Sequence, residues 1–395
     1  MGKRSSEPEK AVVTRAFDDV ARRLREDADR LAEAIVDEIV HTVPAYAAVT
    51  RRSLRRSLLQ HIETAAHSLS LGEVPDRVQD VSVAAERARA GIPIEQVLLA
   101  IRMSFQNLRE FVIQAATESG IRPGIQLEAI RILWEVNDLV SREYAVAHRD
   151  EDLEMARTAE THRVEFVRRM LDEGVNTPDM GLHATSFGLS ATTPYRAFRA
   201  RPGNGESPGA LLQKILGWGA ERHLAPFGAV VDGEAVGILT GEASPGRGPT
   251  VGVGPARELS RIPESYLVAG RMIEVGLEFG RTGPQTLEGL SLLVAVASEH
   301  AVGDDLLDRL LGPLLAQGEF GHELVASLDA FLAADMNTAA AAEVLVVHPN
   351  TLRYRINQVK QLSGLNLRSA KEISEAWWAL RRHEWRKRTG QKPPA

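Results

Sequence analysis

The stretch that most constrains the fold of this chain lies near its C-terminal end and reads NTAAAAEVLVVHPNTLRYRINQVKQLSG, residues 337–364. Asn337 belongs to a residue type that caps helices, and the small alanine side chains after it let a second helix approach closely. We expect this first helix to end at Leu345, with a tight turn at residues 346–347. The pattern predicts a short helix that stops abruptly in front of another one.

The second helix is predicted from Pro349 onward. Proline is well tolerated at the first helical position, and it holds the preceding residue, His348, in the extended conformation of a cap. Apolar residues at helical spacing then give this helix one buried face, formed by Leu352, Ile356 and Val359. The two helices together are predicted to form a helix-turn-helix.

The opposite face of the second helix carries hydrogen-bonding side chains. Such groups suit base edges and phosphates in the major groove of DNA. The alternative is an ordinary amphipathic helix pair, because any surface helix has a polar face. The polar face consists of Asn350, Tyr354, Asn357 and Gln361, with Thr351 and Arg353 on its flanks.

The run VHPNTLRYRIN at residues 347–357, followed by LSGLNL at 362–367, resembles the C-terminal helix-turn-helix of PucR/CdaR-type bacterial transcriptional regulators, which is similar to the Fis-type motif. That family usually has a basic residue where this chain has Pro349, so one phosphate contact is not carried over. The resemblance implies double-stranded DNA as the partner. Because one helix-turn-helix reads few base pairs, we also expect a homodimer or a higher homo-oligomer.

Roles within the motif follow from position. The resemblance makes three residues at the start of the second helix the leading DNA contacts, where backbone amides also attract phosphate. The residue that caps the first helix is expected to approach a phosphate, and exposed side chains further along the second helix are expected to touch DNA. The predicted DNA-binding residues are Asn337, His348, Asn350, Thr351, Arg353, Tyr354 and Asn357.

Composition sets the class of protein. A chain of 395 residues with 44% hydrophobic and 25% charged residues is that of a multidomain globular protein. It has no cysteine, which excludes disulfides and cysteine-ligated metals. The net charge is −6, but the segment from Glu323 to the end has 11 Lys and Arg against 7 Asp and Glu, so the expected DNA-binding end is basic. No membrane span or secretory signal is indicated, and we expect a cytoplasmic protein.

The N-terminal part is predicted to be helical. After a disordered tail at 1–12, residues 13–147 show almost continuous helical patterning that indicates an all-α bundle. The run RARAGIPIEQVLLAIRMSFQNLREF at 87–111 resembles the helical N-terminal domain of RsbR-type stress regulators, which implies a sensor-like input domain. Its last helix is expected to begin with the apolar residues Leu127, Ile130, Leu133, Trp134 and Val136.

An effector is expected at this bundle, either a small molecule in its interior or another protein. Three histidines, His41, His61 and His67, invite a metal or haem hypothesis, but their spacing favours ordinary histidines, and no cofactor is expected. Residues 148–174 read as a connecting helix. A weak heptad seam, Leu139, Val146, Leu153 and Val167, leaves a coiled coil open beside a solvated helix.

Residues 175–300 change to an α+β pattern. Strands are expected at 195–200, 227–231, 235–239 and 249–254, with a hairpin turn at Asp232-Gly233. FGLSATTPYRAFRA at 187–200 and VGVGPARELSRIPESYLVAGRMIEVG at 251–276 resemble the degenerate GGDEF-like domain of the same regulators.

No enzyme is expected. The hairpin lacks the paired glycines and the acidic residues of a diguanylate cyclase, and Asp232 and Glu234 are interpreted as turn residues. Gly252-Val253-Gly254 lacks the third glycine of a dinucleotide loop. Signatures of other nucleotide-binding, zinc and hydrolase sites are also lacking.

The C-terminal domain is placed at 301–390. Its last helix, capped by Ser369, carries the adjacent Trp377 and Trp378, and because both cannot face one core, one of them is a candidate dimer contact. The basic residues at its end oppose the helix dipole or contact phosphate. These residues are Arg381, Arg382, Arg386, Lys387 and Arg388.

The fold class expected is therefore multidomain and mainly α: an N-terminal all-α bundle, an α+β middle domain and a C-terminal helix-turn-helix. The function that fits best is a sequence-specific DNA-binding transcriptional regulator of the PucR/CdaR type with the bundle as its input domain. The alternative is a protein-interaction regulator of a stress or sigma-factor cascade.

Overall fold

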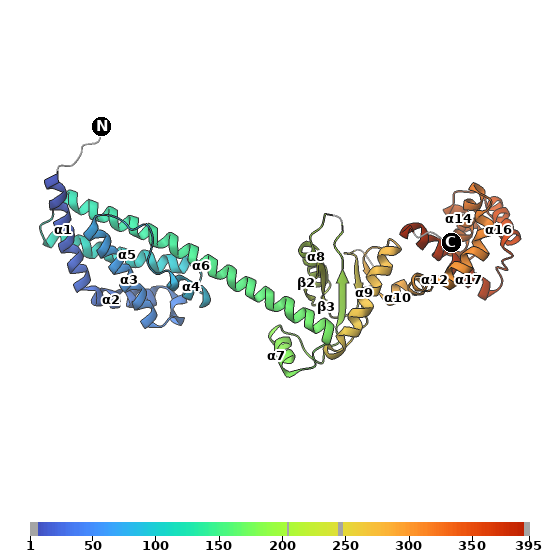
Figure 1. Ribbon diagram of the computed structural model, residues 1–395, viewed down its shortest axis with the longest axis horizontal. Helices are drawn as coiled ribbons and strands as arrows, with labels where there is room; N and C mark the ends of the chain where they lie inside the picture. The colour runs from blue at the N-terminus through green and yellow to red at the C-terminus, as the bar shows by residue number, and fades with distance from the viewer. Residues whose placement is uncertain (1–6, 204, 244–247, 391–395) are drawn as a thin grey trace, which may run out of the picture. The chain divides into compact units, whose positions relative to one another are not determined.

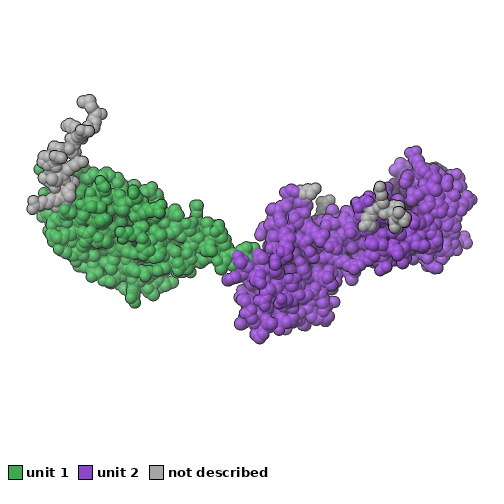
Figure 2. Space-filling model, viewed as in Figure 1, with its two compact units in different colours: residues 1–160 green, residues 161–395 purple. Residues whose placement is uncertain are grey.

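The structure, a computed structural model, describes residues 7–203, 205–243 and 248–390. The chain divides into two compact units, residues 1–160 and 161–395 (Figure 2). Most of the described chain is helical, with one small sheet in the second unit (Figure 1), so the predicted fold class is confirmed. Of the segment expected to be a tail, residues 1–6 lie outside the described residues, and a helix begins at Glu7.

The first unit is a helical bundle. Thr50 caps its third helix by accepting a hydrogen bond from the Ser53 amide, and a 3₁₀ turn at Pro44–Ala48 precedes this cap. Large apolar side chains from every helix form one continuous core. The helices are α1 (Glu7–Glu26), α2 (Ala28–Thr42), α3 (Arg51–Leu71), α4 (Ser82–Arg89), α5 (Ile94–Glu118) and the first part of α6 (Pro123–Glu173).

Two residues expected in the apolar stripe at the start of α6 lie on the surface instead. Leu127 is 68% exposed and Trp134 is 70% exposed, whereas Leu133 and Val136 are buried. The spacing identified an amphipathic helix correctly, but it did not separate the core side from the side that faces outward. The N-terminal unit therefore has apolar side chains on its surface.

Helix α6 continues without a break to Glu173. Leu139 is buried in the bundle, Val167 is buried against the sheet of the second unit, and Val146 and Leu153 between them are 61% and 48% exposed. The four apolar residues of the expected seam thus divide between two cores and the surface. Within this chain they do not form one shared contact.

The sheet of the second unit has the strand order β2-β3-β1-β4-β5, antiparallel except for β4 and β5. One of its faces packs on α7 (Pro178–Ser186), on the end of α6 and on the start of α9 (Ile262–Glu278), and the other packs on α8 (Pro208–Glu221). The strands are β1 (Arg196–Ala200), β2 (Phe227–Val231), β3 (Glu234–Leu239), β4 (Val251–Val253) and β5 (Pro284–Gln285), which confirms the strands predicted around the hairpin.

The glycines of Gly252-Val253-Gly254 serve helix packing. A Cβ on Gly252 would lie 2.1 Å from the Ala269 carbonyl oxygen, and one on Gly254 would lie 2.0 Å from that of Ser265. Both contacts are with the backbone of α9, so these glycines let the helix lie directly against the sheet.

The two hairpin carboxylates are bound by arginines. Asp232, at φ +48° in the turn, accepts a hydrogen bond of 2.7 Å from Arg168. Glu234 is the first residue of β3 rather than a turn residue, and it pairs with Arg199 and Arg201. Burial alone would raise the pKa of Glu234, but these two arginines outweigh it and hold the pKa below its ordinary value.

The remainder of the second unit is helical and builds a core of its own from leucine, valine and alanine side chains. A π-helical segment at Leu307–Leu311 connects two of its helices. The helices are α10 (Leu287–Leu290), α11 (Leu293–Ser298), α12 (His300–Leu306), α13 (Gly312–Leu315), α14 (Glu319–Ala333), α15 (Thr338–Val344), α16 (Pro349–Ser363) and α17 (Ala370–Thr389).

Helix α17 begins at the predicted cap, where the Ser369 side chain accepts from the Glu372 amide. Trp377 and Trp378 are both half-buried in their own chain, in the apolar cluster where α9, α11 and α17 meet. The adjacent Trp378 also contacts the core of the helix-turn-helix. Both tryptophans are therefore partly covered within their own chain, and a dimer contact by one of them stays a prediction.

Most of the basic residues in α17 have carboxylate partners. Arg382, only 2% exposed, and Arg386 both bind Asp304, while Arg381 binds Asp329 and Glu384. Burial acts to raise the pKa of Asp304, but its two arginines outweigh burial and lower it. The expected basic end is thus largely part of the internal ion-pair network of this unit.

Among the helices of the described residues, none combines the length and the apolar character that crossing a membrane requires. His61 is buried in the bundle, and His41 and His67 are exposed. Within the described ranges, no group of three or more His, Cys, Asp or Glu side chains is arranged to hold a metal ion.

Candidate nucleic-acid interface

The first helix of the motif, α15, begins where its sequence predicts. The Asn337 side chain accepts hydrogen bonds from the amides of Ala339, at 3.0 Å, and Ala340, at 3.2 Å. These bonds satisfy two of the amides that have no partner in the first turn of a helix. Ala341 and Ala342 are buried, and their small side chains let α15 lie against α14 and α16.

The turn between the helices is a Schellman motif, built on a residue poorly suited to it. The Val346 amide donates to the Glu343 carbonyl and the Val347 amide to that of Ala342, at 3.1 and 3.0 Å. This geometry places Val346 at φ +53°, where glycine is the usual residue and a β-branched side chain is strained. The Val346 side chain is 91% exposed, so no burial of its methyl groups offsets the strain.

His348 caps the second helix, α16, with its ring. Its backbone is extended, at φ −68° and ψ 142°, and its Nδ1 accepts a hydrogen bond of 3.2 Å from the Asn350 amide. A ring nitrogen that accepts carries no proton, so the neutral imidazole has its proton on Nε2. The cap therefore leaves an exposed N–H donor at the start of α16, beside backbone amides that attract phosphate.

The buried face of α16 holds the helix in place. Leu352 and Val359 are fully buried and Ile356 is 5% exposed, all in one core with α14, α15 and α17. Arg355, at the edge of this face, binds Glu323 of α14. Packing on one side and an ion pair at the edge fix which residues of α16 face outward.

All seven predicted DNA-binding residues are exposed. Arg353 donates a hydrogen bond of 2.8 Å to the side-chain oxygen of Asn350, one turn earlier. The partner is a neutral amide, so the charge of Arg353 remains available to a phosphate or a guanine. Asn350, Arg353 and Asn357 follow at helical spacing and lie along one outward face.

Tyr354 has a second role that its sequence position did not show. Its side chain is 56% exposed, and its ring lies 6.5 Å, centre to centre, from that of Phe320 on α14. The contact orients the phenol at the edge of the exposed face. Removing the ring therefore affects packing as well as any contact of the hydroxyl group.

Two further exposed cations, one on α16 and one just after it, were missed. Lys360 is exposed and lies seven residues after Arg353, which is two helical turns along the same face. Arg368 is exposed in the segment between α16 and α17. The seven-residue spacing was the signal for Lys360, whereas the position of Arg368 depends on how the chain folds back after Gly364, at φ +73°.

Comparisons with known proteins agree with this geometry. Residues 324–382 match the family model of the PucR C-terminal helix-turn-helix domain, which covers α15, α16 and part of α17. Residues 29–163 match that of the RsbT co-antagonist protein rsbRD N-terminal domain, which covers most of the bundle.

The chain is also similar to two curated proteins and one solved structure. It is 37% identical over 108 residues to an uncharacterized protein of Haemophilus influenzae and 28% identical over 130 residues to the uncharacterized protein YsfB of Bacillus subtilis. These matches span 27% and 33% of this chain and 28% and 34% of the two relatives. The crystal structure of a regulator of polyketide synthase expression from Bifidobacterium adolescentis aligns over 58% of this chain and 93% of that chain, with 14% identity and a TM-score of 0.27.

The two family models match opposite ends of the chain, and each matched range agrees with the structure described above. The exposed polar face of α16 lies inside the matched helix-turn-helix, and the bundle coincides with the matched N-terminal domain. With a region similar to the PucR helix-turn-helix domain at one end and a region similar to the RsbRD N-terminal domain at the other, the chain is consistent with a PucR-type DNA-binding transcriptional regulator.

Proposed function

We propose that this protein is a transcriptional regulator that binds specific sites on double-stranded DNA through α16 and receives its input at the N-terminal bundle. One observation carries the proposal: a helix packed on Leu352, Ile356 and Val359 presents its polar face outward, within a matched PucR helix-turn-helix. In this proposal Asn350, Arg353 and their neighbours read base edges and phosphates.

The proposed DNA-binding set combines the predicted and the added residues. His348 Nε2–H and the amides at the start of α16 bind a phosphate, and the cap residue Asn337 approaches another. Thr351, Tyr354 and Asn357 lie beside these contacts. Lys360 and Arg368 extend the cationic surface and contribute through phosphates rather than base edges.

A mobility-shift experiment tests the proposal. Fragments from upstream of the gene itself are titrated with the full-length protein, and an unrelated fragment of equal length serves as the competitor. We expect retarded complexes that survive an excess of the competitor. Equal affinity for both fragments would contradict sequence specificity. Absence of any retarded complex at physiological salt would contradict DNA binding itself.

The alternative is a protein-interaction regulator of a stress or sigma-factor cascade. The match of residues 29–163 to an RsbT co-antagonist domain favours it, because the name of that family refers to a protein partner. The two functions differ in the part of the chain that acts: α16 in one and the bundle surface in the other. If substitutions in α16 abolish regulation in cells while the bundle stays intact, the protein acts through DNA binding rather than through the bundle surface.

We also propose that the protein acts as a homodimer or higher homo-oligomer, in the cytoplasm, where a DNA-binding regulator meets its operator. The tryptophans of α17 give little support for self-association, since they are half-buried in their own chain. The exposed Leu127 and Trp134 of α6 give more, because large apolar side chains at the surface favour association. Light scattering of the full chain that gives only monomer mass, free and with DNA, would contradict this.

We further propose domains at 13–147, 148–174, 175–300 and 301–390, the third being a GGDEF-like domain without catalytic activity. Separate apolar clusters in the bundle, at the sheet and around α16 support the division. The ion pairs of Asp232 and Glu234 support the absence of catalysis, because these carboxylates already hold arginines. Incubation with GTP and Mg²⁺ should yield no cyclic product, and a product lost in Asp232→Ala would contradict this.

A further inference from the structure

A small cavity with a few polar groups lies inside the N-terminal bundle, where five of its helices meet. Its volume is about 20 Å³, enough for one or two non-hydrogen atoms. Apolar side chains make up most of its wall, and α2, α3, α4, α5 and α6 all contribute. The polar residues on its wall are Tyr46, Ser57, His61, Arg87 and Tyr144.

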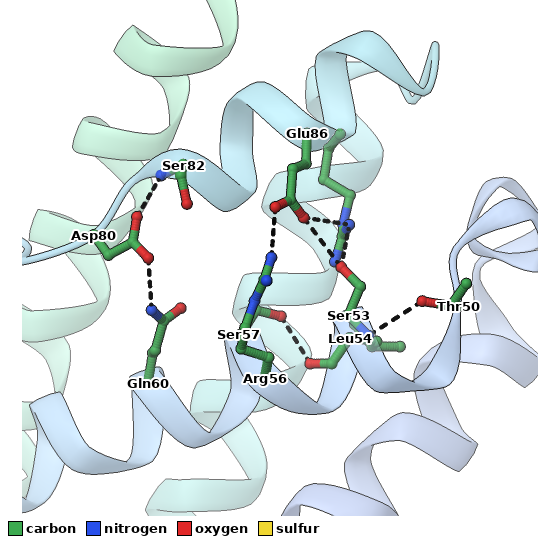
Figure 3. Close-up of polar contacts among 10 residues, drawn as sticks. Thr50, Ser53, Leu54, Arg56, Ser57, Gln60, Asp80, Ser82 and Glu86 are labelled. Atoms are coloured by element: carbon green, nitrogen blue, oxygen red, sulfur yellow. Dashed lines mark hydrogen bonds and ion pairs between the residues drawn. The ribbon is translucent and has the colours of Figure 1, made fainter.

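Arg87 brings a buried positive charge to this cavity. Its side chain is 4% exposed, and it is held by a 3.0 Å hydrogen bond to Ser53 and by the Tyr46 ring, 5.7 Å away. Glu86 approaches only to 3.9 Å and is already bound by Arg56 and Ser53, as Figure 3 shows. Arg87 Nη2 is buried and has no hydrogen-bond partner among the described residues.

His61 and Tyr144 contribute two more buried groups. Their rings meet edge to face at 5.5 Å, and the Tyr144 hydroxyl and His61 Nε2 have no hydrogen-bond partner among the described residues. His61 Nδ1 lies 3.4 Å from the Ser104 hydroxyl, whose one proton is donated to the Ile101 carbonyl at 2.7 Å, so the neutral ring donates from Nδ1 to Ser104 and its Nε2 is an acceptor. Two of the three unpartnered groups, Arg87 Nη2 and the Tyr144 hydroxyl, are therefore donors.

Two donors, one of them cationic, thus line one cavity whose wall contains no Asp or Glu side chain. Buried donors need an acceptor, and a buried charge needs a counter-charge. We propose that this cavity binds a small monovalent anion of halide size, held by Arg87 and Tyr144.

Size and chemistry restrict the occupant. A water molecule supplies an acceptor but leaves the charge of Arg87 without a full counter-ion, and an organic acid with several carbons exceeds the space. Because Tyr144 belongs to α6, the anion contacts the helix that leaves the bundle toward the second unit. This inference rests on the input role proposed above for the bundle. Anion binding is measured without DNA, so a failure to bind the anion can be told apart from a failure to bind DNA.

Calorimetric titration of the full-length protein tests the site. The protein is kept in sodium gluconate, a bulky monovalent anion, and titrated with sodium chloride or sodium formate at constant ionic strength. We expect saturable binding of chloride, and the formate arm shows whether a one-carbon carboxylate shares the site. In crystals soaked in bromide, we expect an anomalous peak between Arg87 and Tyr144.

Variants separate this site from general salt effects. Tyr144→Phe removes only a hydroxyl group and should weaken binding about fivefold, and Arg87→Met should abolish it. Arg89→Met is the matched control, because Arg89 lies on the same helix but is exposed and pairs with Glu151. No saturable heat in the wild type, or equal binding in Tyr144→Phe, Arg87→Met and the control, would mean that the cavity holds water only and would overturn the proposal.

Discussion

Val346 is the residue at which the helix-turn-helix departs most from ordinary backbone preference. A β-branched residue at φ +53° costs about 1–2 kcal/mol relative to glycine, part of which is offset by the extra freedom of glycine in the unfolded chain. Val346→Gly should therefore raise the free energy of unfolding of the C-terminal domain by about 1 kcal/mol. Urea denaturation followed by tryptophan fluorescence measures it.

Val344→Gly is the control for this change. Val344 is also largely exposed, but it is the last residue of α15 and has helical backbone, where replacing valine by glycine should cost up to about 0.5 kcal/mol. Opposite signs for the two substitutions are expected. Equal destabilisation by both would show that the left-handed turn at Val346 is not strained.

His61 makes the stability of the bundle depend on pH. Burial lowers the pKa of His61 to about 4, whereas the unfolded chain titrates near its ordinary value of 6.5. Between these values the unfolded state binds more protons, so stability is full above pH 6.5 and is lost as the pH falls toward 4. The expected loss from His61 between pH 7 and pH 5 is about 2 kcal/mol.

The comparison of His61→Phe with His67→Gln isolates this effect, because His67 lies on the same helix and is exposed. Unfolding of each variant is measured at both pH values in gluconate buffer, so that anion binding does not contribute. The pH dependence should be smaller in His61→Phe and unchanged in His67→Gln. An identical slope in both variants would contradict a buried neutral His61.

At the scale of elements, α16 has one face for stability and another for its proposed contacts. Leu352 is fully buried in the helix-turn-helix core, so Leu352→Ala should lower the free energy of unfolding by about 2–5 kcal/mol. Thr351, its exposed neighbour, should be replaceable by Ala with a change of only about 0.5 kcal/mol but with weaker DNA binding. Chemical denaturation and DNA titration of both variants test this division, and a stability loss of similar size in both would contradict it.

The elements that the sequence predicted well are those with local determinants. Asn337, His348 and Ser369 cap helices through hydrogen bonds to amides two or three residues away, and Asp232-Gly233 needs only its own backbone geometry. Such interactions are visible in a short window of sequence. The starts of α15, α16 and α17 and the hairpin were therefore predicted at the residue level.

What the sequence could not provide depends on contacts between distant segments. Arg382 binds Asp304, 78 residues away, and the Trp385 indole donates to Glu278, 107 residues away. Periodicity showed that the start of α6 is amphipathic, yet it did not exclude Trp134 from the core. The cavity around Arg87 combines five helices, so no single segment carried a signal for it.

At the scale of the whole molecule, the chain joins an input bundle to a DNA-binding end. The total charge of −6 opposes DNA binding, but the outward face of α16 carries the cations Arg353 and Lys360. The arginines of α17 are mostly paired with carboxylates of the same chain. In the proposed complex, association with DNA would therefore depend on a few cations close to the phosphates rather than on the charge of the whole protein.

The central claim is that α16 carries the DNA contact, and the salt dependence of binding in Arg353→Ala tests it most directly. Binding to an operator fragment is measured by fluorescence anisotropy over a range of salt concentrations. Arg309→Ala is the control, because Arg309 has the same charge, is 52% exposed and is paired with Asp305 and Glu375. If Arg353 contacts a phosphate, its loss should weaken binding to all sequences and reduce the salt slope by about 1; if it reads a guanine, the loss should be about 1–3 kcal/mol at one operator position. Wild-type affinity and slope in Arg353→Ala, with the variant folded by circular dichroism and Thr351→Ala and Tyr354→Ala equally unaffected, would contradict the claim.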